Sequence, residues 1–440
     1  MNTHPLDGLV TDGSGDRMTN NNGTDTVARM SEHRPASRGV PTRRLSRPRK
    51  AKPTGCSMSV SYSHVDNALV AEHTSTPDQD VLREWDELVE RSGVDDVAQL
   101  SAWSDIRAAH GYEPIYVFIR QGDRLVAGVQ ILCRRVPVLG TIGYLPYGPV
   151  IAPDVDPRDQ VTRQLAAELS KTGRQLRMLF VQPPVGAEDV SASLLDAGFR
   201  PSDALIAPRA SVRLDITPPE EELVARLPRR LRTWTRQWSK RGVRVRVGNA
   251  EDVARFAELL DNTAAHHRFN PHSEEYLRMQ YDTLASRGNA VLLIGEANGR
   301  PVAGELFTAC GTVVTTRLCG LDRNAETLKL NVASAVTWEG IRWAKANGYH
   351  TVDFGGFKSA SLQALDANPE AETRALAGPD QAKLKFGGEV VRYPEAVEII
   401  SSPVARFLYD AARRHPIGRR VVAGARTVLR GTMSLRRKPS

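Results

Sequence analysis

The chain has 440 residues, a formal net charge of +8 and four cysteines. This length predicts two or three domains, and cysteines without a C-x-x-C pair argue against a disulfide scaffold or a structural zinc site and suit the reducing cytosol. Residues 1–57 carry ten Lys or Arg against five Asp or Glu, and residues 411–440 carry nine against none, so the basic charge belongs to the two ends.

Residues 1–57 are rich in Asn, Gly, Ser, Thr, Pro and Arg and lack apolar periodicity, which predicts a disordered basic tail without a signal peptide. The uncharged run at 136–153 is broken by prolines and glycines, so it predicts strand, turn and strand instead of a membrane helix. Residues 411–440 predict a basic tail or a cationic amphipathic helix suited to the inner face of the membrane.

Helix and strand patterns alternate from about residue 79. The predicted elements are helices around Trp85 and Trp103, strands at 116–120 and 126–134, a helix at 157–172 and a strand at 178–181. We expect Asp156 to cap the 157–172 helix and Gly173 to end it.

The same order then recurs. The second set comprises strands at 291–295 and 302–308, a helix at 330–346 and a strand at 351–354. The triplet Val-Ala-Gly at 126–128 returns at 302–304, an offset of 176, and Gly173 returns as Gly348, an offset of 175. Two landmarks at nearly one spacing predict a duplicated α/β unit.

A hairpin, further strands and a returning helix follow the order of an acetyltransferase (GNAT) domain. We therefore expect an α/β (α+β) fold of two tandem GNAT-like domains, with mixed sheets flanked by helices. The first takes residues 60–205 plus 378–410, and the second takes 206–377. The nearest match to the acetyltransferase pyrophosphate loop, at 317–322, ends in Asp322 where a small residue is needed. Coenzyme A is thus disfavoured, and no cofactor is predicted.

Several motifs, in order, resemble the FemABX peptidyltransferases over about residues 80–410. The motifs are Trp-Ser-Asp-Ile-Arg at 103–107, Tyr-Leu-Pro-Tyr-Gly-Pro-Val at 144–150, the Arg-rich segment ending at 240–243, Val-Asp-Phe-Gly-Gly at 352–356 and Lys-Leu-Lys-Phe-Gly-Gly at 383–388. The resemblance implies a cytoplasmic monomer, possible peripheral membrane contact, and transfer of an amino acid from aminoacyl-tRNA to an amino group of a peptidoglycan precursor, UDP-linked or lipid-linked. The donated amino acid and the acceptor residue stay open.

The resemblance implies a catalytic role for Lys383, because a cation there would stabilise the oxyanion formed when an amine attacks an ester. Lys385 is the alternative to Lys383, because the two side chains lie on the same face if this segment is a strand. Arg107 matches the family's diphosphate-binding position, where an Arg fork suits phosphate, although a cation at a helix C-terminus is the alternative.

Four further substrate-binding candidates are Tyr147, Arg236, Tyr276 and Asp353. Arg236 belongs to a basic helix, in which Pro228 must produce a kink or a restart. The cations of this helix suit tRNA or diphosphate, or a solvated face. Its apolar stripe is formed by Leu223, Leu227, Leu231, Trp234 and Trp238. Asp353 would orient the attacking amine or cap a glycine turn. No metal site is predicted. The rival functions are an acyl-CoA-dependent N-acyltransferase and a non-catalytic module at the membrane surface.

Overall fold

The computed structural model describes residues 68–136, 140–267, 269–368, 376 and 378–414. These residues belong to one compact unit by their contacts. The predicted tail 1–57 and all but the first four residues of 411–440 lie outside the described residues.

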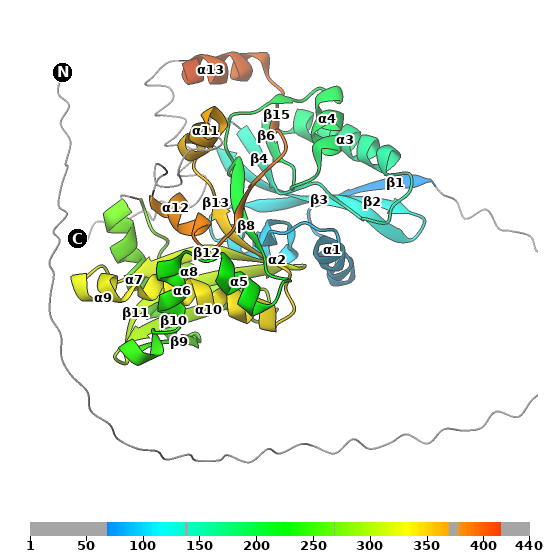
Figure 1. Ribbon diagram of the computed structural model, residues 1–440. Coiled ribbons are helices and arrows are strands. Elements are labelled where there is room, and N and C mark those ends of the chain that lie inside the picture. The colour runs from blue at the N-terminus through cyan, green and yellow to red at the C-terminus, as the bar shows by residue number, and fades with distance from the viewer. Residues whose placement is uncertain (1–67, 137–139, 268, 369–375, 377, 415–440) are drawn as a thin grey trace, which may run out of the picture. The chain divides into compact units, whose positions relative to one another are not determined.

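Two sheets form the framework (Figure 1). In spatial order, the first has β1 (Leu69–Thr74), β2 (Glu113–Gln121), β3 (Arg124–Val136), β4 (Gly140–Pro146), β6 (Met178–Gln182), β15 (Val397–Ile400) and β7 (Arg200–Pro201), with β5 (Val150–Ile151) pairing with β3. The second has β14 (Glu389–Arg392), β8 (Ala210–Asp215), β13 (Thr351–Gly356), β12 (Val313–Leu321), β11 (Arg300–Cys310), β10 (Ala290–Ala297) and β9 (Val243–Val247).

Helices flank both sheets (Figure 1). The first half has α1 (Gln79–Arg91), η1 (Val97–Gln99), α2 (Ser101–Ala108), α3 (Arg158–Gln175), α4 (Glu188–Asp196) and α13 (Pro403–Arg414). The second half has α5 (Glu220–Arg226), α6 (Arg229–Thr235), η2 (Ser239–Arg241), α7 (Asp252–His267), α8 (Glu274–Ala285), α9 (Ala325–Leu330), α10 (Val332–Ala346), α11 (Ser359–Ala367) and α12 (Gly378–Leu384).

The sheet topology confirms the predicted duplication. In each half an antiparallel hairpin leads to a parallel pair, β4 with β6 and β12 with β13, and an antiparallel strand closes the far side. The repeated triplet lies on the second hairpin strand both times. Gly128 there makes room for the ring of Trp85 from α1, and Gly304 makes room for Phe256 from α7. The repeat thus preserves a close helix–sheet contact, which only glycine permits.

Three local expectations were wrong. Helix α3 continues through Gly173 to Gln175, because the missing side chain lets Ile399 of β15 pack there; a Cβ would lie 2.3 Å from Ile399 Cγ2. Pro157, not Asp156, precedes that helix, without a side-chain cap. The helix expected at 330–346 is present as α10, but it begins at Val332 and not at residue 330, because Asn331, with φ +53°, separates it from α9.

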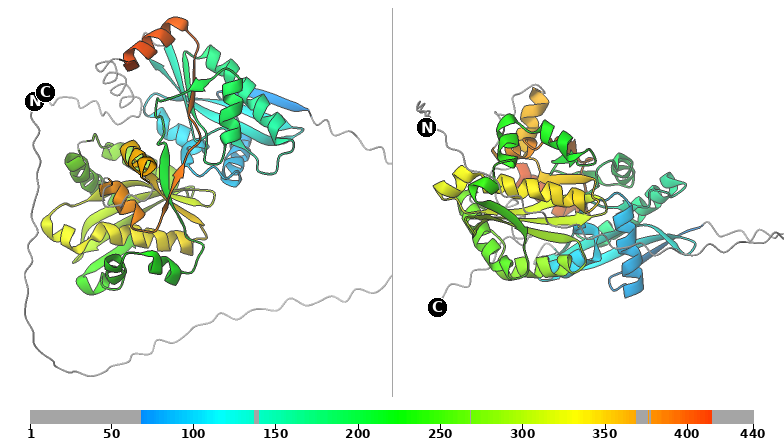
Figure 2. Two further views of the ribbon diagram at one scale, coloured as in Figure 1. Left: turned by 45° about the horizontal axis from the view of Figure 1, so that its top comes forward. Right: turned by 60° about the horizontal axis from the view of Figure 1, so that its bottom comes forward.

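The C-terminal segment 378–410 contributes to both sheets. Strand β14 pairs with β8 in the second sheet, and Phe386 before it packs on Phe354 with ring centres 5.6 Å apart. Strand β15 then enters the first sheet between β6 and β7. The left view of Figure 2 shows this orange-to-red segment passing from one sheet to the other. The chain therefore crosses the junction between the halves twice, before β8 and after β14.

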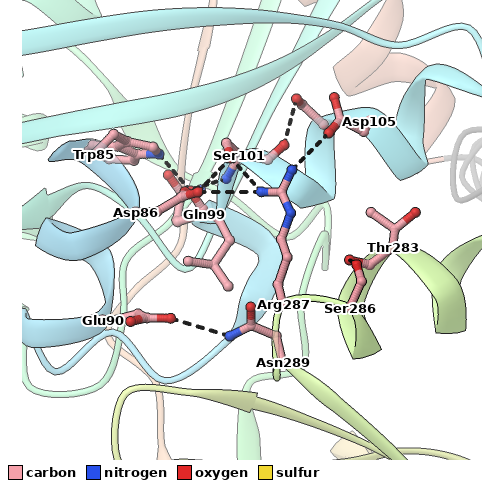
Figure 3. Close-up of polar contacts among 12 residues, drawn as sticks. Trp85, Asp86, Glu90, Gln99, Ser101, Asp105, Thr283, Ser286, Arg287 and Asn289 are labelled. Atoms are coloured by element: carbon pink, nitrogen blue, oxygen red, sulfur yellow. Dashed lines mark hydrogen bonds and ion pairs between the residues drawn. The ribbon is translucent and has the colours of Figure 1, made fainter. Parts of the chain in front are cut away.

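Polar contacts join the halves beside α1 and α2 (Figure 3). Arg287, just after α8, donates to Ser101 Oγ at 3.1 Å and lies 3.6 Å from a carboxylate oxygen of both Asp86 and Asp105. Nearby, Asn289 Nδ2 lies 3.3 Å from Glu90 Oε1. The apolar core of the first half also takes in side chains from α8 and β11 of the second. The junction is consequently a packed interface, on which a site can be built with fixed geometry.

Candidate functional site

A cavity of about 500 Å³ lies where the halves meet. Its walls come from α2, β4 and residues 205–209 on one side, and from α8, β12 and residues 357–359 on the other. The lining includes cations and aromatic rings: Arg107, Arg209, Arg317 and Lys358, with Trp103, Tyr112, Tyr144, Tyr147 and Tyr276. We call this cavity the cleft. Such a lining suits a large anionic ligand that also carries ring systems.

The structure places three predicted substrate-binding residues in the cleft: Arg107, Tyr147 and Tyr276. Helix α2 ends just after Arg107, whose buried guanidinium carbon lies 4.6 Å from the centre of the Tyr112 ring. Tyr147 follows β4 with φ +55°. Residues 103–107 and 144–150, which the sequence singled out separately, are thus brought to one wall.

Arg317 is a cleft cation that the sequence did not identify as a binding residue. Its guanidinium donates to Asp96 Oδ2 at 3.1 Å and lies 4.5 Å from the centre of the Trp103 ring. The sequence presented it only as the start of a failed pyrophosphate loop. Residues 317–321 are in fact part of β12, and Gly320 packs against the backbone of α7. This strand geometry gives residues 317–321 no phosphate-cradling turn.

His272 also lines the cleft, beside Tyr276. Its ring centre is 4.7 Å from that of Tyr276, and its Nδ1 is buried without a hydrogen-bond partner among the described residues. Burial lowers the pKa of His272 to about 4, helped by the positive charges of His110, Arg107 and Arg317. The imidazole is therefore neutral at pH 7.

A second cavity of about 240 Å³ adjoins the cleft, because Tyr147, Pro208 and Arg317 line both. We call it the inner chamber. The charged residues of its lining are Asp95, Asp96, Arg317 and Asp353, and both Asp95 and Asp353 pair with the guanidinium of Arg213. Asp353 Oδ2 accepts from Arg213 Nε at 3.0 Å, and burial raises the pKa of both carboxyl groups.

Asp353 also caps a glycine turn, one of the two roles expected for it. Its Oδ1 accepts from the backbone N–H of Gly355 at 2.7 Å, and its Oδ2 accepts from Ser211 Oγ at 3.0 Å. The backbone thereby turns at Gly355, whose φ is +77°, along the wall of the inner chamber. With these partners the Asp353 carboxylate is a fixed structural anion of the chamber.

Lys383 lies behind that wall. It projects from α12, and its Nζ donates to the carbonyl oxygens of Gly355 at 3.2 Å and Gly356 at 2.5 Å. Burial lowers its pKa, while Asp380 and Asp353 oppose the change. The segment is helical and not a strand, so Lys385 does not share a face with Lys383; it is exposed, with Nζ 3.3 Å from Gln381 Oε1.

Arg236 lies away from the cleft lining, at the end of α6. The predicted apolar stripe of this region is confirmed, since its five members are all buried in the second core, and Pro228 separates α5 from α6 as expected. Five cations between Pro228 and Gly242 are exposed: Arg229, Arg230, Arg236, Lys240 and Arg241. These five define the basic face, which is a surface feature and not part of the cavity.

Within the described part of the chain, no cluster of three or more His, Cys, Asp or Glu side chains is arranged to hold a metal ion. In the same part, no helix is both long enough and apolar enough to span a bilayer.

Comparison with known proteins agrees with this architecture. Residues 225–361 match the model of an acetyltransferase (GNAT) domain. A lipid II:glycine glycyltransferase of Staphylococcus haemolyticus is 26% identical over 238 residues, which are 51% of this chain and 56% of that protein. The corresponding protein of Staphylococcus epidermidis is 27% identical over 220 residues, 47% and 52% of the two chains. The crystal structure of FemX superposes with a TM-score of 0.65 at 17% identity, covering 76% of this chain and 99% of FemX.

The chain is similar to FemABX proteins in sequence and in fold. The expected tandem GNAT-like fold is confirmed, because the FemX match covers both halves and the junction between them. The match to the glycyltransferases covers a smaller part of both chains, because the chain spans only a little over half the length of these relatives. Arg107 and Tyr147 of the cleft lie in the first half, and Tyr276 and Arg317 lie in the second, so the cleft draws on both sides of the junction.

Proposed function

We propose that this protein transfers an amino acid from aminoacyl-tRNA to an amino group of a peptidoglycan precursor. The cleft supports this most directly, because it offers two fixed guanidinium groups, Arg107 and Arg317, together with aromatic walls. A precursor carries a diphosphate and sugar rings, which are complementary to that lining. The activity of the staphylococcal relatives, lipid II:glycine glycyl transfer, belongs to the same reaction class.

Arg107 and Arg317 are held by neighbours before any substrate binds. Arg107 rests over Tyr112, and Arg317 over Trp103, so each guanidinium is oriented by an aromatic face. Preorganised cations bind phosphate without first losing side-chain entropy. In our proposal they grip the diphosphate, and the stem peptide extends toward the inner chamber, which shares Arg317 with the cleft.

Lys383 is proposed to stabilise the oxyanion or the departing ribose oxygen. The amine attacks the ester carbonyl, the carbon becomes tetrahedral, and collapse expels the tRNA 3′-terminal oxygen. An ammonium close to the reacting carbonyl stabilises this negative charge, typically by about 3 kcal/mol. Lys383 also holds the turn at 355–356 through its hydrogen bonds to the backbone. Asp380, on the same helix, holds the residues that follow the turn, since it accepts from Ser361 Oγ at 2.6 Å and from Lys358 N at 3.3 Å. Holding this turn is therefore the competing structural role.

The basic face is proposed to contact the acceptor arm of tRNA. Its five exposed cations stand on a short, well-packed helical segment, and no acidic residue lies between 223 and 250. Clustered cations bind nucleic-acid phosphates through release of counterions. Binding should weaken steeply with salt.

One assay tests the reaction. Purified full-length protein is incubated with a precursor and tRNA charged with a labelled mixture of amino acids. We expect label on the precursor, and treatment of the charged tRNA with RNase beforehand should abolish it. Transfer from acyl-CoA under the same conditions would favour the acyl-CoA-dependent N-acyltransferase. Precursor or membrane binding without any transfer would favour the non-catalytic module and overturn the proposal. The proposed substrates imply a cytoplasmic location. The precursor is either UDP-linked or lipid-linked.

A further inference from the structure

The last described helix, α13, presents one face to the protein and another to solvent. On the inner face, Ala405 and Tyr409 pack on the small apolar cluster that includes Phe180. Arg200 donates to Asp410 at 2.7 and 2.9 Å, which fixes the same side of the helix. The helix is therefore attached to the first half in one orientation (Figure 1).

The outer face of α13 is apolar. Val404, Phe407 and Leu408 are 68%, 71% and 60% exposed, the largest values among the exposed large hydrophobic side chains of the described residues. Their spacing of i, i+3 and i+4 places them on one side, and exposed Ala411 extends it at i+7. Single exposed apolar residues are ordinary, but three adjacent ones on one helix face mark an interaction surface.

The charge around this face is positive. Asp410, the one acidic residue of α13, is paired with Arg200, while Arg414 at the helix end is exposed. The sequence continues for 26 residues, 415–440, which include seven Lys or Arg and no Asp or Glu. An apolar helix face next to a strongly basic segment is complementary to a surface that is apolar below and anionic above.

We propose that the outer face of α13 docks this protein on an anionic phospholipid bilayer, with Phe407 and Leu408 inserted among the lipids. The helix then lies along the membrane and does not cross it. Insertion of a few apolar side chains binds weakly alone, so the exposed cations of α13, Arg406 and Arg414, supply the second interaction. This inference goes beyond the proposed reaction and does not depend on it, because it concerns a surface that the cleft does not include.

Sedimentation with vesicles tests the proposal. The full chain is mixed with vesicles of phosphatidylcholine alone or with added phosphatidylglycerol. We expect binding to the anionic vesicles, reduced about tenfold or more by the double variant Phe407→Ser and Leu408→Ser and reduced by salt. The matched control is Val70→Ser with Val247→Ser, which removes two side chains that are 59% and 58% exposed on edge strands. It should bind like the wild type.

Three results would overturn the proposal: no binding by the wild type, equal binding to both vesicle types, or unchanged binding by the double variant. Sedimentation velocity without lipid tests whether the face binds a second copy of the chain instead. If the wild type is dimeric and the double variant monomeric, the face is an interface between copies. Because both substituted side chains are exposed, thermal unfolding should not change, and transfer to a soluble UDP-linked precursor should be unaffected. Failure of docking is thus distinguishable from failure of the proposed reaction.

Discussion

The guanidinium of Arg317 lies 4.5 Å from the centre of the Trp103 ring and donates to Asp96 Oδ2 at 3.1 Å. Arg317 belongs to β12 of the second half, whereas Trp103 and Asp96 belong to the first. One residue therefore connects the halves and supplies positive charge to both the cleft and the inner chamber. Packing of the two halves against each other therefore also forms the anion-binding surface.

Replacing Arg317 with Gln should consequently lower both stability and precursor binding. The substitution leaves Asp96 buried without its cation, which should cost about 2 kcal/mol after allowance for the partial exposure of Arg317. Urea unfolding measures the stability, and calorimetry measures the affinity for a UDP-linked precursor. Arg317→Lys keeps the charge but loses the planar stacking, so it should recover more stability than affinity. Unchanged affinity in the Gln variant would remove Arg317 from the binding surface.

Lys383→Met should reduce the transfer rate constant by roughly a hundredfold to a thousandfold if the ammonium stabilises the oxyanion. The measurement is single-turnover transfer from a preformed aminoacyl-tRNA. Lys383→Arg, which keeps a cation at a different position, should recover part of the rate. The precursor affinity should change little in either variant.

Asp380→Asn is the matched control for the structural role of Lys383. Asp380 fixes the same 355–361 segment through Ser361 and the backbone of Lys358, and it is buried. If holding that segment is all that Lys383 does, the Asn variant should slow transfer as much as the Met variant. A much smaller effect of the Asn variant supports a direct contact between Lys383 and the reacting group.

The sequence predicted the duplicated fold because its signals are local. Hairpin turns, helix periodicity and the repeated Val-Ala-Gly triplet depend on neighbouring residues. Arg317 was not predicted as a binding residue because its partners, Asp96 and Trp103, are more than two hundred positions away in the chain. Lys385 was placed on the wrong face because a short segment near Gly-Gly gives no clear period, and α12 has only seven residues. Gly173 was misread since glycine signals both a helix end and a close approach.

Gly173→Ala tests that close approach. The new Cβ would lie 2.3 Å from Ile399 Cγ2, so either α3 or β15 has to move. We expect a loss of about 1–3 kcal/mol in unfolding free energy, in spite of the better helix propensity of Ala. Gly378→Ala is the control, because its Cβ would meet nothing within 4 Å. Adding Ile399→Ala should relieve the clash; a stable single variant would mean that the helix and strand separate easily.

Glu305 makes the unfolding free energy depend on pH. Burial raises its pKa from 4.5 to about 7, although its Oε2 accepts from Thr337 Oγ1 at 3.0 Å. Because the folded state holds the proton more tightly, stability from this group is complete below about pH 4.5 and is lost as pH rises to about 7. The loss amounts to at most about 3 kcal/mol. Glu305→Gln should therefore be more stable than the wild type at pH 8, and the two should converge near pH 4.5 in urea titrations.

His272 should couple precursor binding to proton uptake. Burial lowers its pKa to about 4, and the facing groups His110, Arg107 and Arg317 act in the same direction. A bound diphosphate would offset the two guanidinium charges and raise that pKa, so the complex would hold a proton that the free protein lacks. Affinity should then increase as pH falls from about 7 to about 5.

Calorimetry near pH 5, in two buffers with different ionisation enthalpies, measures the uptake directly. We expect a fraction of a proton for the wild type and a smaller one for His272→Gln, whose amide does not titrate. The Gln variant should bind about as well as the wild type at pH 8, where both side chains are neutral. Equal uptake by the two proteins would show that the proton enters elsewhere and that the diphosphate does not lie beside His272.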